Sequence, residues 1–404
     1  MQCGLLGRKL GHSYSPQIHA LLGDYGYTLW EREPEDVEAF VRNGPWDGLN
    51  VTIPYKKTVL PLCDVLDPLA RQLGSVNTLV RLGTGEIFGT NTDAWGFDQM
   101  LGRTGVSVAG KKVLVLGSGG ASVTVQAVLR LAEASVVVIS RTGEDNYDNL
   151  HRHRDAAVIV NTTPVGMYPH NGESPVDLSL FPRLEAVLDL IYNPARTRLL
   201  LDAEERGIPR EGGLYMLVAQ AAQAAMLWTG REISDDTIRS VWEHIGASME
   251  NLILIGMPGC GKSTVARLLG EALNRKVVDS DEEIVRQAGP IPAYFAQHGE
   301  EAFRQLETRV LAELGKESGL VIATGGGCVT RPENYRLLHQ NGRLIWLQRD
   351  PDRLPVDGRP VSRREGIDAL LAQRTPLYRQ FSDRIADNNK TPEETVREIL
   401  SRSN

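Results

Sequence analysis

A glycine-rich loop in the second half of the chain constrains the fold more than any other feature. An apolar run covers residues 251–255, a glycine-rich segment covers 256–263, and a helical pattern extends from 264 to 273. A strand, a G-x-x-x-x-G-K-[ST] loop and a helix in this order form the phosphate-binding loop of nucleotide-binding domains. Such a loop normally lies near the start of its domain. The segment before it, about 250 residues, is therefore outside that domain and is long enough to form a separate protein.

Each part of this loop has a physical role in binding phosphate. Backbone N–H groups surround phosphate oxygens at a helix N-terminus, whose dipole favours anions. Lys262 can reach the β- and γ-phosphates, and the Ser263 hydroxyl can ligate Mg²⁺. A glycine-rich turn that binds nothing is the alternative, but the flanking strand and helix favour a nucleoside triphosphate. The expected contacts are Gly256, Met257, Pro258, Gly259, Cys260, Gly261, Lys262, Ser263 and Thr264.

Composition and charge indicate several globular domains that act on small molecules. A chain of 404 residues predicts two to three domains, and 42% hydrophobic with 24% charged residues is an ordinary globular composition. A net charge of −7 without a long basic run argues against a nucleic-acid surface. The four cysteines have no paired or metal-binding spacing, and no signal peptide or membrane-spanning run is present. We expect a cytoplasmic protein with no nucleic-acid or membrane partner.

A second glycine cluster predicts a dinucleotide-binding unit. Apolar strand runs cover 112–116 and 135–139, and a helical segment covers 123–132 between them. The first strand is followed by Gly117, Ser118, Gly119, Gly120 and Ala121. This is the βαβ arrangement of dinucleotide-binding folds. Ser122 replaces the third glycine of the usual pattern and is small enough to let helix and strand approach.

The end of the second strand discriminates between two cofactors. An NAD site places Asp or Glu there to bind the ribose 2′-hydroxyl. This chain has Ser140, Arg141 and Thr142, a cation and two hydroxyls that suit a 2′-phosphate. The pattern therefore favours NADP over NAD, with an Arg141 that only caps a surface turn as the alternative.

Polar side chains cluster in residues 1–100 more densely than a structural role explains. Ser13 and Ser15 precede a predicted helix at 17–22, where they either cap the helix or donate to a carboxylate. A lysine and an aspartate accompany neutral hydrogen-bonding groups, which together suit a site for a polyhydroxylated acid. These residues are Asn50, Thr52, Lys56, Asn77 and Asp93.

The order of these motifs in residues 1–246 resembles that of the shikimate dehydrogenases. The match comprises the serine pair, the runs 48–56, 74–79 and 89–93, the glycine loop with Arg141, and the runs 161–167, 189–194 and 213–220. The resemblance implies a substrate-binding domain at 1–100, completed by helices at about 213–246, and a Rossmann-like NADP-binding domain at 101–246. One departure is a short connection of nineteen residues between Arg141 and Asn161, which implies a trimmed dinucleotide-binding domain.

The same resemblance implies the roles of individual residues. Lys56 and Asp93 would form the acid/base pair, since hydride transfer to a ketone leaves an alkoxide that needs a proton and a cation. The substrate would contact Ser13, Ser15, Asn50, Thr52, Asn77, Tyr192 and Gln220. NADP(H) would contact residues 117–121, residues 140–142, Thr162, Met167 and Gly213.

Residues 249–404 are similar to the shikimate kinases. Asp279 and Asp281 stand at the end of a predicted strand, and because alternate strand positions face the same side, we expect both in one site. Arg304 and Glu307, three apart on a predicted helix, are expected to pair. Further matches are Gly325, Gly326 and Gly327 after the strand 320–322, Arg359 in a shortened lid at 349–360, and Arg374.

The resemblance to the kinases implies a fold and a set of roles. The fold would be the nucleoside-monophosphate-kinase-like parallel sheet with helices on both faces. Asp279 and Ser263 would hold Mg²⁺, and Asp281 would accept the proton of a shikimate hydroxyl. Shikimate would also contact Arg304, Arg374 and the three glycines, whereas Lys262 and Arg359 would act on the transferring phosphoryl group.

The whole chain is therefore expected to be an α/β bifunctional enzyme of aromatic amino acid biosynthesis. One part would reduce 3-dehydroshikimate with NADPH, and the other would phosphorylate shikimate with ATP and Mg²⁺. A regulator or scaffold with one inactive domain is an alternative, although every acid, base and phosphate-binding residue is present. A second alternative is an NAD-linked quinate or shikimate oxidoreductase, against which Arg141 argues.

Overall fold

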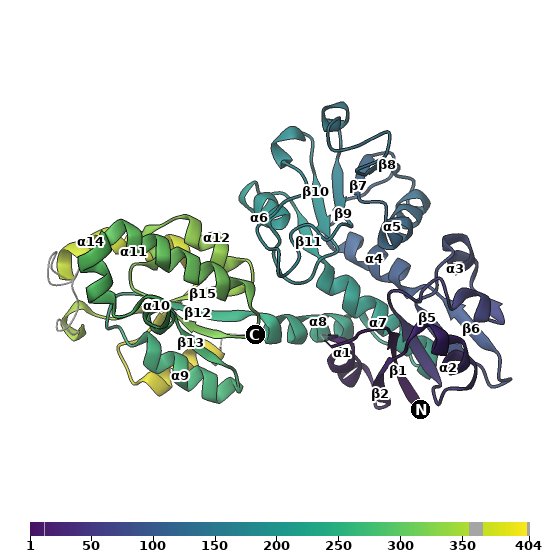
Figure 1. Ribbon diagram of the computed structural model, residues 1–404, viewed down its shortest axis with the longest axis horizontal. Helices are drawn as coiled ribbons and strands as arrows, with labels where there is room; N and C mark the ends of the chain where they lie inside the picture. The colour runs from purple at the N-terminus through teal and green to yellow at the C-terminus, as the bar shows by residue number, and fades with distance from the viewer. Residues whose placement is uncertain (12, 355–366, 402–404) are drawn as a thin grey trace. The chain divides into compact units, whose positions relative to one another are not determined.

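Three β-sheets organise the chain, and the α/β fold class is confirmed (Figure 1). The computed structural model describes residues 1–11, 13–354 and 367–401. Two compact units are present. The first comprises Met1–Met167, Glu173–Tyr192 and Thr197–Ala247, and the second comprises Tyr168–Gly172, Asn193–Arg196 and Ser248–Asn404.

The first sheet is mixed and has the strand order β2-β1-β3-β5-β6-β4. β1 pairs in parallel with β2 and β3, whereas β5 runs antiparallel to β3 and β6. Its strands are β1 Gln2–Gly7, β2 Gly26–Glu31, β3 Gly48–Val51, β4 Val65–Leu66, β5 Thr78–Arg81 and β6 Ile87–Thr90. Helices α1 Ser15–Leu22, α2 Val37–Asn43 and α3 Pro68–Leu73 lie between these strands in the chain.

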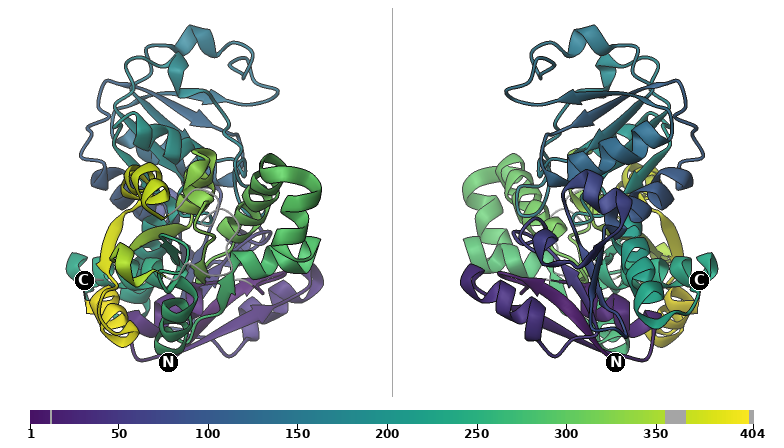
Figure 2. Two further views of the ribbon diagram at one scale, coloured as in Figure 1. Left: turned by 90° about the vertical axis from the view of Figure 1, so that its left-hand side faces the viewer. Right: turned by 90° about the vertical axis from the view of Figure 1, so that its right-hand side faces the viewer.

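The second sheet is entirely parallel, with the order β11-β10-β9-β7-β8, and occupies a separate region of the first unit in both views of Figure 2. Its strands are β7 Lys112–Leu116, β8 Ser135–Ile139, β9 Val158–Asn161, β10 Ala186–Asp189 and β11 Arg210–Gly212. The helices of the first unit from residue 92 onward are α4 Thr92–Arg103, α5 Gly120–Leu131, α6 Arg198–Glu205, α7 Gly213–Thr229 and α8 Asp235–Met249. Helix α7 packs on the first sheet, where Trp228 Nε1 donates to Leu79 O at 3.1 Å.

The connection from β8 to β9 is short, as the residue count predicts. It holds one turn of 3₁₀ helix at Leu150–His153 and neither an α-helix nor a strand, within a segment that the structure describes in full. Its tight course is held locally, since Asn149 Oδ1 accepts from Asn146 N at 2.9 Å and Asn149 Nδ2 donates to Glu144 O at 2.8 Å.

The third sheet forms the second unit and is parallel throughout, with the order β13-β14-β12-β15-β16. Its strands are β12 Asn251–Ile255, β13 Val277–Asp279, β14 Val321–Ala323, β15 Gly342–Gln348 and β16 Arg384–Asp387. The helices are α9 Lys262–Leu273, α10 Ser280–Ala288, α11 Ile291–Lys316, α12 Glu333–His339, α14 Ile367–Phe381 and α15 Pro392–Ser401. The central β12 is buried on both faces, which explains its unbroken apolar sequence.

The predicted boundary between residues 246 and 249 falls inside a helix. Helix α8 continues to Met249, and β12 begins at Asn251 after a single residue. The residues between the two predicted ranges are therefore helical. The other predicted domain limits stay predictions.

Two candidate active sites

A pocket of about 590 Å³ in the first unit gathers the polar residues that the sequence singles out. Residues from six separate motifs line it: Ser13, Ser15, Asn50, Thr52, Lys56, Asn77, Asp93, Tyr192 and Gln220. Gly213 and Ala121 of the predicted cofactor set also line it, together with apolar side chains such as Leu190 and Met216, which lie within the motif runs but were not predicted as site residues.

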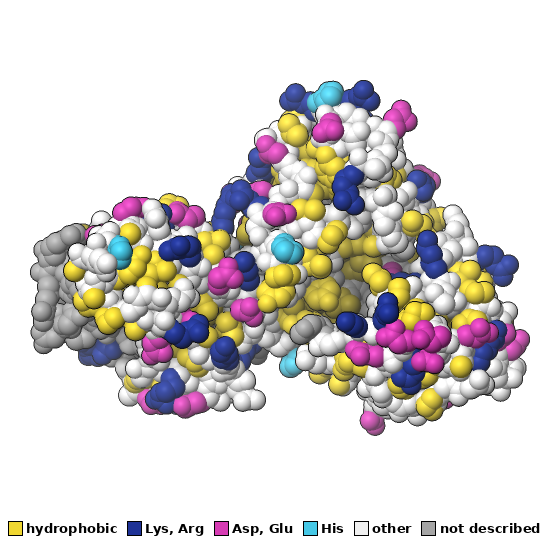
Figure 3. Space-filling view, viewed as in Figure 1, with side chains coloured by type: hydrophobic (Ala, Val, Ile, Leu, Met, Phe, Trp, Pro, Cys, Tyr) yellow, Lys and Arg dark blue, Asp and Glu magenta, His cyan; other side chains and the backbone are white. Residues whose placement is uncertain are grey.

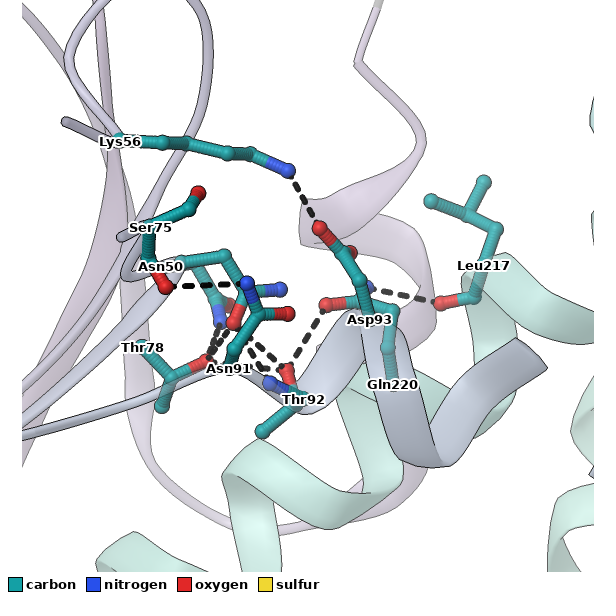
Figure 4. Close-up of polar contacts among 10 residues, drawn as sticks. Asn50, Lys56, Ser75, Thr78, Asn91, Thr92, Asp93, Leu217 and Gln220 are labelled. Atoms are coloured by element: carbon teal, nitrogen blue, oxygen red, sulfur yellow. Dashed lines mark hydrogen bonds and ion pairs between the residues drawn. The ribbon is translucent and has the colours of Figure 1, made fainter. Parts of the chain in front are cut away.

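Lys56 and Asp93 form an ion pair in this pocket, with Nζ and Oδ2 2.5 Å apart (Figure 4). Asp93 lies in the first turn of α4, and Lys56 approaches it from the loop after β3. Both side chains are only partly exposed. A lysine held in this way keeps further N–H protons for an oxygen in the pocket, and the carboxylate fixes its position.

The amide of Asn77 has one possible orientation. Its Oδ1 accepts from the backbone N–H of Thr92 at 2.7 Å, and a backbone N–H can only donate. Thr78 Oγ1 and Thr92 Oγ1 lie 3.1 and 3.2 Å from the same oxygen. The NH₂ group of Asn77 is therefore the part that remains for the pocket. The motifs contain Thr78 and Thr92, but their spacing alone did not reveal this support.

Neither serine of the N-terminal pair is the N-cap residue of helix α1. The helix begins at Ser15, its N-cap residue is Tyr14, and no side-chain hydrogen bond closes the cap. Ser13 Oγ accepts from Ser15 N at 3.2 Å, and both serines line the pocket. Ser13 thus accepts the first N–H of α1 through its oxygen, and the hydroxyl protons of both serines can still serve a ligand in the pocket.

The glycine cluster after β7 leaves its backbone open to a ligand. Gly117 has φ +104°, and a Cβ there would collide with Thr162 and Thr163. A Cβ at Gly119 or Gly120 would meet nothing, so these peptides can be approached closely. Helix α5 begins at Gly120, three residues before the predicted start, and its N-terminus suits a pyrophosphate.

The remaining predicted cofactor contacts lie around this glycine cluster and along the same sheet. Thr162, after β9, donates through Oγ1 to Leu116 O at 2.6 Å. Ser140, Arg141 and Thr142 follow β8, with Arg141 exposed. Met167 is an exposed apolar side chain. The residues present thus fit a dinucleotide with a charged 2′-substituent.

A second pocket, of about 720 Å³, lies in the second unit. It is lined by most of the predicted nucleotide and substrate residues: Pro258, Gly259, Gly261, Lys262, Ser263, Thr264, Asp279, Asp281, Arg304, Gly325, Gly326, Gly327 and Arg374. Gly256, Met257 and Cys260 belong to the loop without lining the pocket. Phe295, Phe303 and Ile291 form an apolar wall that the motifs did not predict.

The phosphate-binding loop and the first acid are arranged for a nucleotide and a divalent cation. Lys262 Nζ donates to the carbonyls of Gly256 and Met257 at 2.9 and 3.0 Å. Ser263 Oγ donates to Asp279 Oδ2 at 2.6 Å. A hydroxyl and a carboxylate side by side are oxygen ligands of the kind that Mg²⁺ takes, so these residues fit the cation.

Asp281 lines the pocket as predicted, but it does not stand on a strand. The strand ends at Asp279, and α10 begins at Ser280, so Asp281 stands in the first helical turn. The reason is a cap that the alternation argument ignored, because Asp279 Oδ1 accepts from Asp281 N at 2.9 Å. The pKa of Asp281 is raised to about 6, mainly by burial and in addition by the nearby carboxylates of Asp279 and Glu307.

The predicted pair of Arg304 and Glu307 forms and is buried. Nη1 and Oε2 are 2.7 Å apart, and the Glu307 side chain is 1% exposed. Burial raises the pKa of Glu307, whereas Arg304 opposes this effect. Helix α11 is broken at Gly299, with φ +80°, just before the turn that carries both residues. Sequence spacing indicated the pair but not that Glu307 itself lines the pocket.

Charged side chains lie against the glycine turn after β14 and leave no room for a Cβ at two of its positions. A Cβ on Gly327 would overlap the Arg304 guanidinium, and a Cβ on Gly325 would collide with the carboxylates of Asp281 and Glu307. Arg374 Nη1 donates to Gly326 O at 3.2 Å. The turn thus lets two arginines and two carboxylates face one space. Arg359 lies outside the described residues.

The surface and the cysteines agree with the composition. On the face drawn in Figure 3, basic side chains alternate with acidic ones and form no continuous basic area among the coloured residues. All four cysteines are free. Within the described ranges, none of the helices has the length and apolar character needed to cross a membrane.

Comparisons with known proteins address both pockets. The family model "Shikimate dehydrogenase substrate binding domain" matches residues 5–79, and the model "Shikimate kinase" matches residues 258–404. The shikimate dehydrogenase (NADP(+)) of Clostridium perfringens is 33% identical over 265 residues, covering 60% of this chain and 97% of the relative. That of Methanopyrus kandleri is 38% identical over 277 residues, covering 60% of this chain and 95% of the relative.

Solved structures are similar over the same part of the chain. A chorismate mutase/shikimate 5-dehydrogenase fusion protein from Clostridium acetobutylicum has a TM-score of 0.57 at 38% identity, covering 60% of this chain and 96% of that one. Shikimate 5-dehydrogenase from Thermus thermophilus, in complex with NADP(H) and shikimate, has a TM-score of 0.55 at 32% identity, covering 60% and 99%.

Proposed function

The chain belongs to the shikimate dehydrogenase family and carries a shikimate kinase domain at its C-terminal end, and we propose that its two pockets catalyse consecutive reactions. The first reduces 3-dehydroshikimate to shikimate with NADPH. The second transfers a phosphoryl group from ATP to a hydroxyl of shikimate. The observation that carries this proposal is that one chain holds both pockets. The first contains Lys56 and Asp93, and the second contains Asp281 with the cations Lys262, Arg304 and Arg374.

In the reduction, Lys56 supplies the proton and Asp93 positions it. Bound NADPH supplies the hydride. As negative charge develops on the former ketone oxygen, a proton passes from Lys56 Nζ to that oxygen, while the ion pair at 2.5 Å keeps Nζ in place. The NH₂ group of Asn77 donates to a ring oxygen, since its Oδ1 is already occupied by Thr92 N–H.

The carboxylate of the substrate is held by hydroxyl groups in this proposal. Ser13, Ser15 and Tyr192 are hydrogen-bond donors in the lining of the same pocket, and Gln220 and Thr52 add further polar atoms for the ring hydroxyls. The phosphates of the dinucleotide would be held by the open glycine backbone at 117–121, and its 2′-phosphate by Arg141 with Ser140 and Thr142.

In the phosphorylation, Asp281 accepts the proton of the attacking hydroxyl. Its pKa near 6 leaves it ionised at neutral pH yet close enough to act as a base. Arg304 and Arg374 hold the carboxylate, and Lys262 neutralises phosphate charge. Ser263 and Asp279 would hold Mg²⁺, which supplies further charge neutralisation when bound. Arg359 is proposed to contribute from the lid, on the family resemblance alone.

Location and domain limits are part of the proposal. Four free cysteines support a reducing, cytoplasmic location. A substrate-binding domain at 1–100 completed by about 213–246, an NADP-binding domain at 101–246 and a kinase domain at 249–404 remain our proposed division.

Two assays on the intact chain test the proposal. NADPH consumption with 3-dehydroshikimate and ATP consumption with shikimate should both be observed, and two halves split near Ser248 should each retain one activity. A chain that binds both ligands and turns over neither would favour the regulator or scaffold. A preference for NADH with quinate would favour the NAD-linked oxidoreductase.

A further inference from the structure

A buried histidine lies behind the pocket of the first unit. His19 of α1 is 1% exposed, and its ring stacks on those of Tyr27 and Trp228, with centroids 4.1 and 5.2 Å away. Burial lowers the pKa of His19 to about 3, because an imidazolium at this position would lose its hydration. The ring is therefore neutral, so one nitrogen donates and the other accepts.

The two ring nitrogens contact different partners, which assigns the tautomer. Nε2 lies 3.1 Å from Oδ1 of Asn50, and Nδ1 lies 2.7 Å from the hydroxyl of Tyr25. An amide oxygen can only accept, so Nε2 carries the proton and Nδ1 accepts from Tyr25. The Tyr27 hydroxyl donates to the same Asn50 oxygen at 2.9 Å. Two buried donors thus occupy the Asn50 carbonyl.

The other end of the Asn50 amide is assigned by the neighbouring strand. Asn50 Nδ2 donates to Thr78 Oγ1 at 3.2 Å. Thr78 Oγ1 lies 3.1 Å from Asn77 Oδ1, the oxygen that accepts from Thr92 N–H, and 3.0 Å from Thr92 Oγ1, so its single proton has acceptors on that side and toward Asn50 it accepts. One N–H of Asn50 is left over, and Asn50 lines the pocket. The amide therefore presents a donor to the ligand.

We propose that His19 is a positioning residue for the reduction. By donating to the Asn50 oxygen, it holds the Asn50 amide so that an N–H of that amide faces the pocket. That N–H then favours a substrate with an oxygen acceptor at this position. The proposal rests on the proposed dehydrogenase function. His19 itself is not among the residues that line the pocket, so its effect passes through Asn50.

Two substitutions separate this role from ordinary packing. His19→Leu keeps apolar bulk but removes the donor, and we expect the KM for 3-dehydroshikimate to rise about five- to tenfold, the effect of one lost hydrogen bond. The kcat and the KM for NADPH should stay within about twofold. His19→Gln offers an N–H near the position of Nε2 and should restore most of the affinity. His244→Leu, at an exposed position on α8, is the matched control.

A double-mutant cycle tests whether the effect passes through Asn50. In an Asn50→Ala background, His19→Leu should change the KM for 3-dehydroshikimate no further. If the two effects multiply, or if His19→Leu in an active enzyme leaves the KM unchanged, the positioning role is overturned. Should His19→Leu fail to fold, Tyr27→Phe removes the second donor to Asn50 with little change of shape; because the Tyr27 hydroxyl also interacts with Ser15, it must raise the same KM in the wild-type background and change it no further in the Asn50→Ala background. A wild-type chain with no reduction at all would instead overturn the proposed function.

Discussion

The two pockets meet the same carboxylated, hydroxylated ring with different chemistry in our proposal. In the first unit the lining holds the Lys56–Asp93 pair and Lys9 among neutral donors and acceptors. In the second unit Lys262, Arg304 and Arg374 face Asp279, Asp281 and Glu307 across one space.

The difference follows from the charge that each reaction creates. Hydride transfer produces one alkoxide, which one lysine can stabilise and protonate. Phosphoryl transfer brings several phosphate charges next to a carboxylate, and catalysis consists mostly of placing cations around them. Buried charges of one sign need charges of the other, which explains the carboxylates beside the arginines. A ligand does not fix the chemistry of its site; the reaction does.

The largest effect should come from Lys56→Ala. Removing a positioned proton donor costs about 10²- to 10⁴-fold in rate, and because the proton is needed mainly in the transition state, kcat for the reduction should fall by that factor. Binding of NADPH, measured by fluorescence titration, should change little. Kinase turnover in the same sample is the control. A variant with near-normal kcat would reduce Lys56 to an ordinary pocket residue and weaken the contrast between the sites.

Arg304→Met should affect the second pocket by both binding and stability. The substitution removes a carboxylate contact and leaves Glu307 buried without its partner, and breaking a buried pair costs about 3–5 kcal/mol. We expect the KM for shikimate to rise at least about tenfold, with a lower Tm in thermal unfolding.

The double variant Arg304→Met/Glu307→Gln separates these two contributions. It removes the unpaired charge, so the Tm should recover in part while the KM for shikimate stays high. The NADPH-dependent reduction is the control for both variants. A KM that recovers together with the Tm would show that Arg304 acts on the fold alone.

Much of the framework of both pockets could be predicted from sequence. Strands β7, β8 and β12 begin and end at the predicted residues. For β7 and β12 the reason is burial on both faces, which produces a continuous apolar run, whereas β8 is a partly exposed edge strand whose valines favour the extended chain. Helix starts were less accurate, since α5 and α9 begin within glycine loops that show no helical periodicity. Asp281 lies in the predicted pocket, but it was expected on a strand; its place in a helix was missed because Asp279 caps a helix that begins at Ser280.

The support behind the ligand-binding side chains could not be predicted. Asn50 is opposite Thr78 only because β3 and β5 pair antiparallel in one register, which no local pattern specifies. His19 lies on helix α1 and contacts Asn50 of β3, which is distant in sequence. In sequence alone, a histidine on the apolar face of a helix is equally consistent with a core residue that has no contact with the site. Motifs identified side chains that face the ligand, whereas strand register and packing decide how those side chains are oriented.

Arg141→Asp should produce a moderate effect confined to the cofactor of the first unit. The arginine is exposed after β8, where the 2′-phosphate of NADP is proposed to lie. Loss of a charge-assisted contact removes about 1.5–3 kcal/mol, and a like charge adds repulsion. The ratio of kcat/KM for NADPH to that for NADH should therefore fall at least about tenfold. An unchanged ratio would assign cofactor discrimination to Ser140, Thr142 or the short connection after them.

The smallest effect is a pH dependence that should appear in the kinase reaction through Asp281. Burial, aided by Asp279 and Glu307, raises its pKa to about 6, so the carboxylate is the form that exists above that pH. A base must be ionised to accept the hydroxyl proton, and kcat/KM for phosphorylation should thus be flat above pH 7 and fall below pH 6. Between pH 7.5 and 5.5 the ionised fraction drops about fourfold.

The reduction has no such carboxylate base in our proposal, so its profile should not fall in parallel over this interval. Initial rates of both reactions, measured across pH 5–8 on one preparation, provide the comparison. Glu307→Gln removes one of the two carboxylates that raise the pKa of Asp281, and should move the kinase inflection to lower pH. A kinase profile that stays flat down to pH 5 would contradict the assignment of Asp281 as the base.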